Sequence, residues 1–79
     1  MQPICIMKSL EDVVRENLRR IRDERDLSLG ELSRRCGHHR TYLGKIERGK
    51  RSPSLRTVDE LAEALEIDRL ELLKDPEAS

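Results

Sequence analysis

The sequence has no phenylalanine and no tryptophan, and Tyr42 is its single tyrosine. A hydrophobic core must therefore be built from aliphatic side chains. The sequence also lacks the run of about 20 apolar residues that a membrane-spanning helix needs. Its apolar stretch at residues 3–7 is shorter than the core of a signal peptide. We therefore expect a soluble, cytoplasmic protein with no membrane partner.

Cysteine is scarce too, and it is not arranged for metal binding. Cys5 and Cys36 lack the paired spacing of a metal or disulfide framework. Cys36 lies near His38 and His39, but a structural zinc site takes about four ligands, which is more than this cluster offers. The chain also has no evident nucleophile–base pair and no glycine-rich phosphate loop. The sequence therefore predicts no metal, no cofactor, no small-molecule ligand and no enzyme activity.

At 79 residues the chain has room for one small domain. A single core of this size usually contributes only about 3–5 kcal/mol to folding, so a second copy of the chain is a reasonable source of further stability. We expect the domain at residues 9–74, between an N-terminal tail at 1–8 and a C-terminal tail at 75–79.

The formal net charge is zero, but the charges are unevenly spread. Residues 15–51 hold twelve Lys and Arg against six Asp and Glu, a net charge of +6. Residues 52–79 hold three against eight, a net charge of −5. A basic middle beside an acidic end orients a molecule in the field of a polyanion such as DNA. An ordinary salt-bridged surface is the alternative.

Capping signals and apolar spacing predict an all-α fold of five helices and no strand. Ser9 is expected to cap a helix that runs to about Arg25. Ser28 and Glu31 form a capping box that starts the second helix, and Gly37 is placed to stop it.

The remaining helices are predicted from the same kinds of signal. Gly49 ends the third helix, and Ser54 caps the fourth. Asp68 and Glu71 form a capping box for a short fifth helix at about residues 69–74.

The third predicted helix, at about residues 39–48, has two distinct faces. At 100° per residue, Leu43 and Ile46 point to one side. The opposite arc has three cations, a hydroxyl and a glycine, and no acid: Arg40, Thr41, Gly44, Lys45 and Arg48. A helix-turn-helix needs such a basic second helix, after a glycine turn, to insert into the major groove of DNA. We therefore predict sequence-specific binding of double-stranded DNA.

Individual side chains suit particular DNA contacts. Arg40 lies in the first helical turn, which usually reaches base edges, and arginine can hold guanine through two hydrogen bonds. Thr41 suits a thymine methyl group, and Lys45 suits a guanine or a phosphate. For Tyr42, both a DNA contact and a place at the edge of the core are possible interpretations. The expected phosphate contacts are Arg48, Lys50, Arg51 and Ser54.

Two further residues of this helix need an explanation. Gly44 costs a helix interior about 1 kcal/mol relative to alanine, so we interpret the missing side chain as room for the backbone to approach DNA. Neutral drift at a tolerant surface position is the alternative. Glu47 is the one acid in residues 34–51, and we hypothesise that it forms an ion pair with Arg22 that locks this helix onto the first.

Residues 40–51, followed by Pro53-Ser54-Leu55, resemble the recognition helix and loop of the lambda-repressor-like family, the Cro/C1 or xenobiotic-response-element class of regulators. Residues 62–65 resemble the family's fourth helix, and Leu72-Leu73 the end of its fifth. The resemblance implies a compact five-helix bundle that binds a pseudo-palindromic DNA operator as a dimer. The implied base contacts are those of Arg40, Thr41, Tyr42 and Lys45, and the implied ion pair is that of Arg22 and Glu47.

Three positions depart from the family pattern. Leu29 stands where a glutamine usually helps to hold a phosphate, and His38 stands where an apolar residue is usual. His39 replaces the serine or threonine that caps the recognition helix. We therefore expect weaker capping there, and we interpret His39 as a DNA contact instead.

Family members this small include phage repressors, restriction–modification controller proteins and antitoxins, and residues 39–43 resemble the controller group most. The alternative function is that of an antitoxin or another protein-interaction module with secondary DNA binding. The fifth helix predicts a homodimer, because it has more apolar side chains than one short helix can bury against its own domain. The expected dimer interface consists of Ile67, Leu70, Leu72 and Leu73.

Overall fold

The computed structural model describes residues 9–75, and that part of the chain contains five α-helices and no β-strand. The predicted all-α fold is therefore confirmed. The predicted tail at residues 1–8, Cys5 included, and all but Asp75 of the predicted tail at 75–79 lie outside the described residues. None of the described helices has both the length and the apolar character needed to span a bilayer. The helices are α1 (Leu10–Glu24), α2 (Leu29–Cys36), α3 (Arg40–Glu47), α4 (Leu55–Leu65) and α5 (Arg69–Leu73).

Serine side chains start three of the helices, as predicted. The hydroxyl of Ser9 accepts the N–H of Asp12 before α1, and that of Ser54 accepts the N–H of Thr57 before α4, both at 3.1 Å. Before α2 the full capping box is present, because Ser28 and Glu31 each accept the other's backbone N–H at 3.1 Å. Each bond satisfies a donor that the first turn of a helix leaves free.

The start of α5 differs in detail from its prediction. The carboxylate of Asp68 accepts the N–H of Leu70 at 2.9 Å, and the N–H of Glu71 is bound instead by the backbone carbonyl of Asp68 at 2.9 Å. Asp68 is therefore a simple cap for this five-residue helix, in place of the predicted capping box.

Glycines in the left-handed conformation follow α2 and α3. Gly37 has φ +81° and Gly49 has φ +76°, values that side chains with a Cβ adopt only at a cost. Both predicted stops are therefore confirmed, and the turn at Gly37 sets the direction in which the chain enters α3.

The core is aliphatic, as the composition requires. All five helices contribute to it, and each of its largest members has an exposed fraction of 0%. These wholly buried side chains are Leu18, Leu32, Leu43, Ile46, Leu61, Leu65 and Leu72.

Leu72 corrects part of the predicted dimer interface. This side chain is wholly buried in its own domain, so it has no surface to offer a partner. The side-chain amide of Asn17, which is also wholly buried, donates to the backbone carbonyls of Leu72 at 2.9 Å and of Lys74 at 2.8 Å. Asn17 thus docks the end of α5 onto α1, while the side chain of Leu72 lies in the core.

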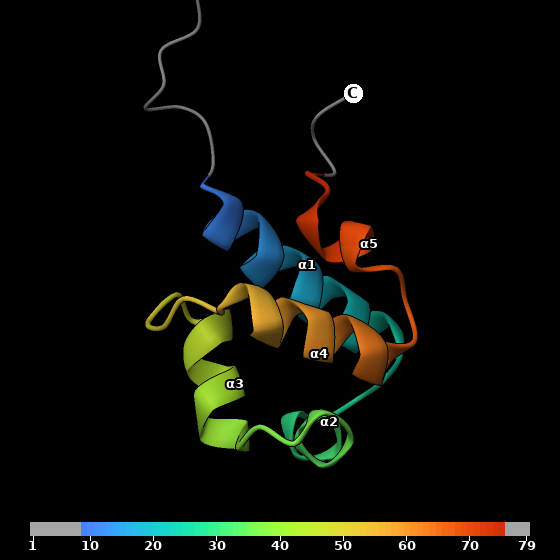
Figure 1. Ribbon diagram of the computed structural model, residues 1–79. Helices are drawn as coiled ribbons and strands as arrows, with labels where there is room; N and C mark the ends of the chain where they lie inside the picture. The colour runs from blue at the N-terminus through green and yellow to red at the C-terminus, as the bar shows by residue number, and fades with distance from the viewer. Residues whose placement is uncertain (1–8, 76–79) are drawn as a thin grey trace, which may run out of the picture.

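The arrangement of the helices separates two ends of the molecule. Figure 1 shows α1 and α5 side by side at one end and α2 with α3 at the other, with α4 between them. The chain passes from α3 through an exposed loop into α4, so the loop borders α3 on the outside of the bundle.

Candidate nucleic-acid interface

The helix α3 buries its apolar face and exposes its basic one. Leu43 and Ile46 are wholly buried, whereas the side chains of the opposite arc are open to solvent. Within residues 9–75, no carboxylate lies at ion-pair distance from Arg40, Lys45 or Arg48. The face is therefore positively charged and unneutralised by the described part of the protein. Its exposed residues are His39, Arg40, Thr41, Lys45 and Arg48.

An ion pair holds α3 against α1. Arg22 donates from Nε to Oε2 of Glu47 at 2.7 Å and from Nη2 to Oε1 at 3.0 Å, and Glu47 is only 8% exposed. The hydrogen bonds to Glu47 raise the pKa of Arg22 above its usual value, so the guanidinium keeps its charge. Arg22 also donates to the backbone carbonyl of Leu27 at 2.7 Å. The pair expected from the sequence is present, and it fixes α3 relative to both α1 and the start of α2.

Gly44 corrects the interpretation of its missing side chain. The residue is buried, and a Cβ built on it would lie 3.1 Å from Nη1 of Arg48 and 3.6 Å from Cδ1 of Leu29. The backbone of α3 at this point is therefore covered by an arginine side chain and by α2. The position therefore faces the protein's own side chains in this structure, and not a free surface for DNA.

His39 caps α3 and is exposed at the same time. Its Nδ1 accepts the backbone N–H of Thr41 at 3.0 Å, so the neutral ring has its proton on Nε2. The cap that the sequence left in doubt therefore exists. The same ring has a free donor on its other nitrogen.

The loop after α3 keeps its cations next to the basic face. The backbone N–H groups of Lys50 and Arg51 both bond to the carbonyl of Lys45, at 2.8 and 3.3 Å. Ser54, at the end of the loop, is exposed and engaged in its cap. Of the expected phosphate contacts, Arg48, Lys50 and Arg51 are therefore exposed at the end of α3, whereas Ser54 also lines a groove between α1 and α4.

Tyr42 is half-buried between α3, the loop and α4. Its hydroxyl lies 3.4 Å from Oγ1 of Thr57, its ring centroid lies 5.3 Å from that of His38, and the guanidinium carbon of Arg51 lies 5.5 Å from the ring centroid. His38 in turn contacts Glu60 of α4, with 2.6 Å between Nε2 and Oε1. The half-buried ring agrees with the expected place of Tyr42 at the edge of the core, whereas its contacts with His38 and Arg51 were not predicted.

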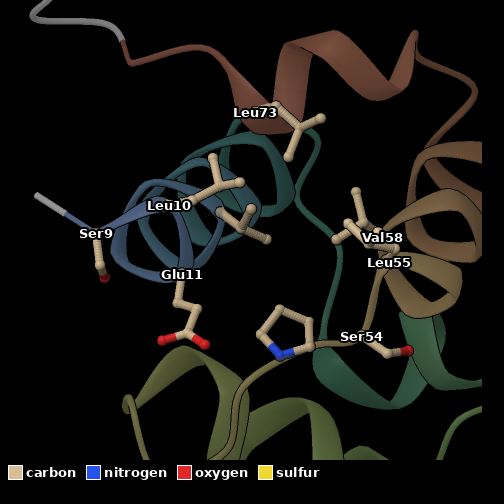
Figure 2. A pocket seen from close by; sticks show the side chains of 9 residues that line it. Ser9, Leu10, Glu11, Ser54, Leu55, Val58 and Leu73 are labelled. Atoms are coloured by element: carbon tan, nitrogen blue, oxygen red, sulfur yellow. The ribbon is translucent and has the colours of Figure 1, made fainter.

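A second surface, formed by α1, α4 and α5, is apolar. Leu10, Leu55 and Leu70 are 53%, 77% and 62% exposed. Figure 2 shows Leu10 of α1, Leu55 and Val58 of α4, and Leu73 of α5 lining one groove. Leu73 also lines an adjacent hollow with Leu70, so the apolar surface continues along α5.

Comparisons with known proteins agree on one family. The model of the helix-turn-helix family HTH_3 matches residues 18–72. Control protein C.SmaI of Serratia marcescens is 39% identical to this chain over 70 residues, which are 89% of this chain and 82% of that protein.

Two solved structures share both the fold and part of the sequence. The hypothetical transcription factor NHTF from Neisseria has a TM-score of 0.82 and 31% identity, over 96% of this chain and 90% of that one. The restriction-modification controller protein C.AhdI from Aeromonas hydrophila has a TM-score of 0.74 and 37% identity, over 78% of this chain and 94% of that one.

Proposed function

We propose that this chain, which belongs to the helix-turn-helix family HTH_3, binds a pseudo-palindromic operator as a homodimer in the cytoplasm. Members of that family are DNA-binding transcriptional regulators and not enzymes. The domain at residues 9–74 is the proposed DNA-binding unit, with α3 in the major groove.

The exposed, acid-free face of α3 is the observation that supports this proposal most. We assign base contacts to its outward side chains because Arg40 and Thr41 lie in the first turn, and that turn of a recognition helix usually reaches base edges. Lys45 lies one turn further on. The proposed base contacts are His39, Arg40, Thr41, Tyr42 and Lys45.

Phosphate contacts are assigned to the cations and the hydroxyl around this helix. Phosphate contacts supply affinity and orientation without reading the sequence, which suits exposed side chains on a loop. The proposed phosphate contacts are Arg48, Lys50, Arg51 and Ser54.

The dimer is proposed to form through the apolar surface of α5 and the adjoining groove. Exposed leucines that adjoin one another mark an interaction surface, because single exposed ones are common on monomers but contiguous ones are not. Leu70 and Leu73 are continuous with Leu10 and Leu55 of the groove, and Ile67 is half-buried beside α5. Two-fold pairing there would place the two copies of α3 about 34 Å apart, one turn of DNA.

The similarity to C.SmaI and C.AhdI favours a controller-type regulator over an antitoxin. In that role the protein would bind DNA near genes whose expression it adjusts. An antitoxin would instead depend on a protein partner.

Selection of bound sites from a library of random DNA duplexes, followed by a salt titration, tests the function. We expect enrichment of a sequence with two-fold symmetry and a steep fall in its affinity with salt, because each neutralised phosphate releases counterions. Failure to enrich any sequence would contradict the proposal.

Equilibrium sedimentation of the parent and of Leu70→Lys tests the dimer separately. The parent should associate with increasing concentration, whereas the variant should remain a folded monomer, because Leu70 is mostly exposed in the single chain. A parent mass that stays monomeric at every concentration would exclude the dimer.

A further inference from the structure

The turn that precedes α3 is tied to α4 by a side-chain contact. His38 lies in this turn, and its Nε2 is 2.6 Å from Oε1 of Glu60. Both side chains are partly exposed, at 27% for His38 and 42% for Glu60. The contact therefore joins two segments at the surface of the helix-turn-helix, outside the core that holds the bundle together.

The same histidine ring packs on Tyr42. The two ring centroids are 5.3 Å apart and the planes are tilted by 41°, within the range of favourable aromatic pairs. Tyr42 is held a second time at its hydroxyl, which lies 3.4 Å from Oγ1 of Thr57. Thr57 is only 4% exposed and has a second contact, 3.0 Å to the hydroxyl of Ser54. The ring of Tyr42 is thus restrained at both its side and its tip.

Arg51 rests on the ring that His38 restrains. Its guanidinium carbon lies 5.5 Å from the centroid of Tyr42, a cation–π distance. The backbone of Arg51 is bound to the carbonyl of Lys45 at the end of α3. Among the described residues no carboxylate pairs with this guanidinium, so the aromatic ring is what directs it.

From this chain of contacts we infer that His38 is a positioning residue for DNA recognition: anchored by Glu60, it sets the ring of Tyr42 and, through that ring, the direction of Arg51. The inference rests on the proposed function and adds a determinant that does not itself touch DNA. A side chain that is already held in its bound direction loses less freedom on binding, which increases affinity.

His38→Leu removes both the bond to Glu60 and the aromatic pair. We expect it to weaken binding to the duplex enriched in the site selection by about threefold to tenfold, toward the lower end of the coupling between residues in contact, because the ring on which Arg51 rests loses its restraint. Glu60→Ala removes only the anchor and should act in the same direction with a smaller effect. Because Glu60 is partly exposed, the Glu60→Ala variant should fold even if the His38→Leu variant does not.

Double variants separate positioning from general destabilisation. In an Arg51→Ala background, His38→Leu and Glu60→Ala should each change the affinity less than about twofold, because the side chain that they direct is absent. In a Lys50→Ala background, their effects should be undiminished, because among the described residues the Lys50 side chain has no hydrogen bond, ion pair or ring contact with His38, Tyr42 or Glu60. Thermal unfolding of each variant without DNA completes the comparison.

Three outcomes would overturn the inference. The first is that neither His38→Leu nor Glu60→Ala changes the affinity for DNA. The second is that their effects on affinity add fully to that of Arg51→Ala. The third is that the losses of affinity follow the losses of thermal stability in both the Arg51→Ala and the Lys50→Ala backgrounds. Each leaves specific binding by the parent intact, so the inference would fail alone. If the parent enriches no duplex, the proposed function fails and the inference fails with it.

Discussion

Arg22 and Glu47 join α1 to α3 through an ion pair with two hydrogen bonds. The same guanidinium also holds the backbone just before α2. One residue therefore sets the position of both helices of the helix-turn-helix relative to α1. The angle at which α3 leaves the bundle depends on this pair as much as on the apolar core.

Glu47→Ala should reduce the free energy of unfolding by about 2–3 kcal/mol, because it leaves the largely buried guanidinium of Arg22 without its partner. Urea denaturation measures this loss. The matched control is Glu24→Ala, which breaks the exposed pair with Arg20 and should cost less than about 0.5 kcal/mol. Equal losses of unfolding free energy for the two substitutions would show that the Arg22–Glu47 pair stabilises the fold no more than an exposed ion pair does.

Gly44→Ala should stabilise the domain by up to about 1 kcal/mol, the difference in helix propensity between the two residues. The new methyl group meets the end of the flexible, exposed Arg48 side chain at 3.1 Å, and that side chain can move aside. Thermal unfolding checks the sign.

Gly37→Ala is the matched control for this substitution. A Cβ at Gly37 meets nothing within 4 Å, but φ is +81°, so alanine should destabilise the domain by about 1 kcal/mol. A destabilised Gly44→Ala variant would mean that the packing of α2 on α3 is too tight for a methyl group.

Asn17→Ala should release the end of α5 from α1. It removes two donors and leaves the carbonyls of Leu72 and Lys74 without their partner, at a cost of about 2–3 kcal/mol. Relative to the parent, the variant should show a larger acceleration of hydrogen exchange in α5 than in α3. Uniform acceleration along the chain would show that α5 has no separate attachment.

Acid should weaken the start of α2. The backbone N–H of Ser28, and then its hydroxyl, hold the pKa of Glu31 below its usual value of 4.5. Glu31 therefore stabilises the fold above that value, and its contribution is lost as the pH falls through the lowered pKa. Urea denaturation from neutral to acid pH should show a smaller decline for Glu31→Gln, and identical pH profiles would contradict the capping role.

Most of the fold was predictable because its signals are local. Ser9, Ser28 and Ser54 each cap the next few residues, and Gly37 ends a helix through its own backbone angle. Such signals need only the neighbours in sequence. They therefore located the helices and separated the basic face of α3 from its buried one.

The predictions from sequence that the structure corrects concern contacts between segments that are distant in sequence. A helical wheel placed Gly44 on the basic arc, but it could not show that Leu29 of α2 covers that position. The expected dimer interface included Leu72, but that side chain is buried where α5 docks onto α1, and this docking involves Asn17, 55 residues earlier in the chain. His38 was noted as unusual, but its contact with Glu60 depends on how α4 packs.

The exposed face of α3 is proposed to read base pairs. The most direct test of this proposal is to measure the binding of Arg40→Ala and Lys50→Ala to the selected duplex and to every single base-pair variant of it. Arg40→Ala should lose about 1–3 kcal/mol of discrimination at one G·C pair, whereas Lys50→Ala should weaken all duplexes alike and flatten the salt dependence. An Arg40→Ala protein that keeps the parent's preference at every position would show that Arg40 does not contact a base.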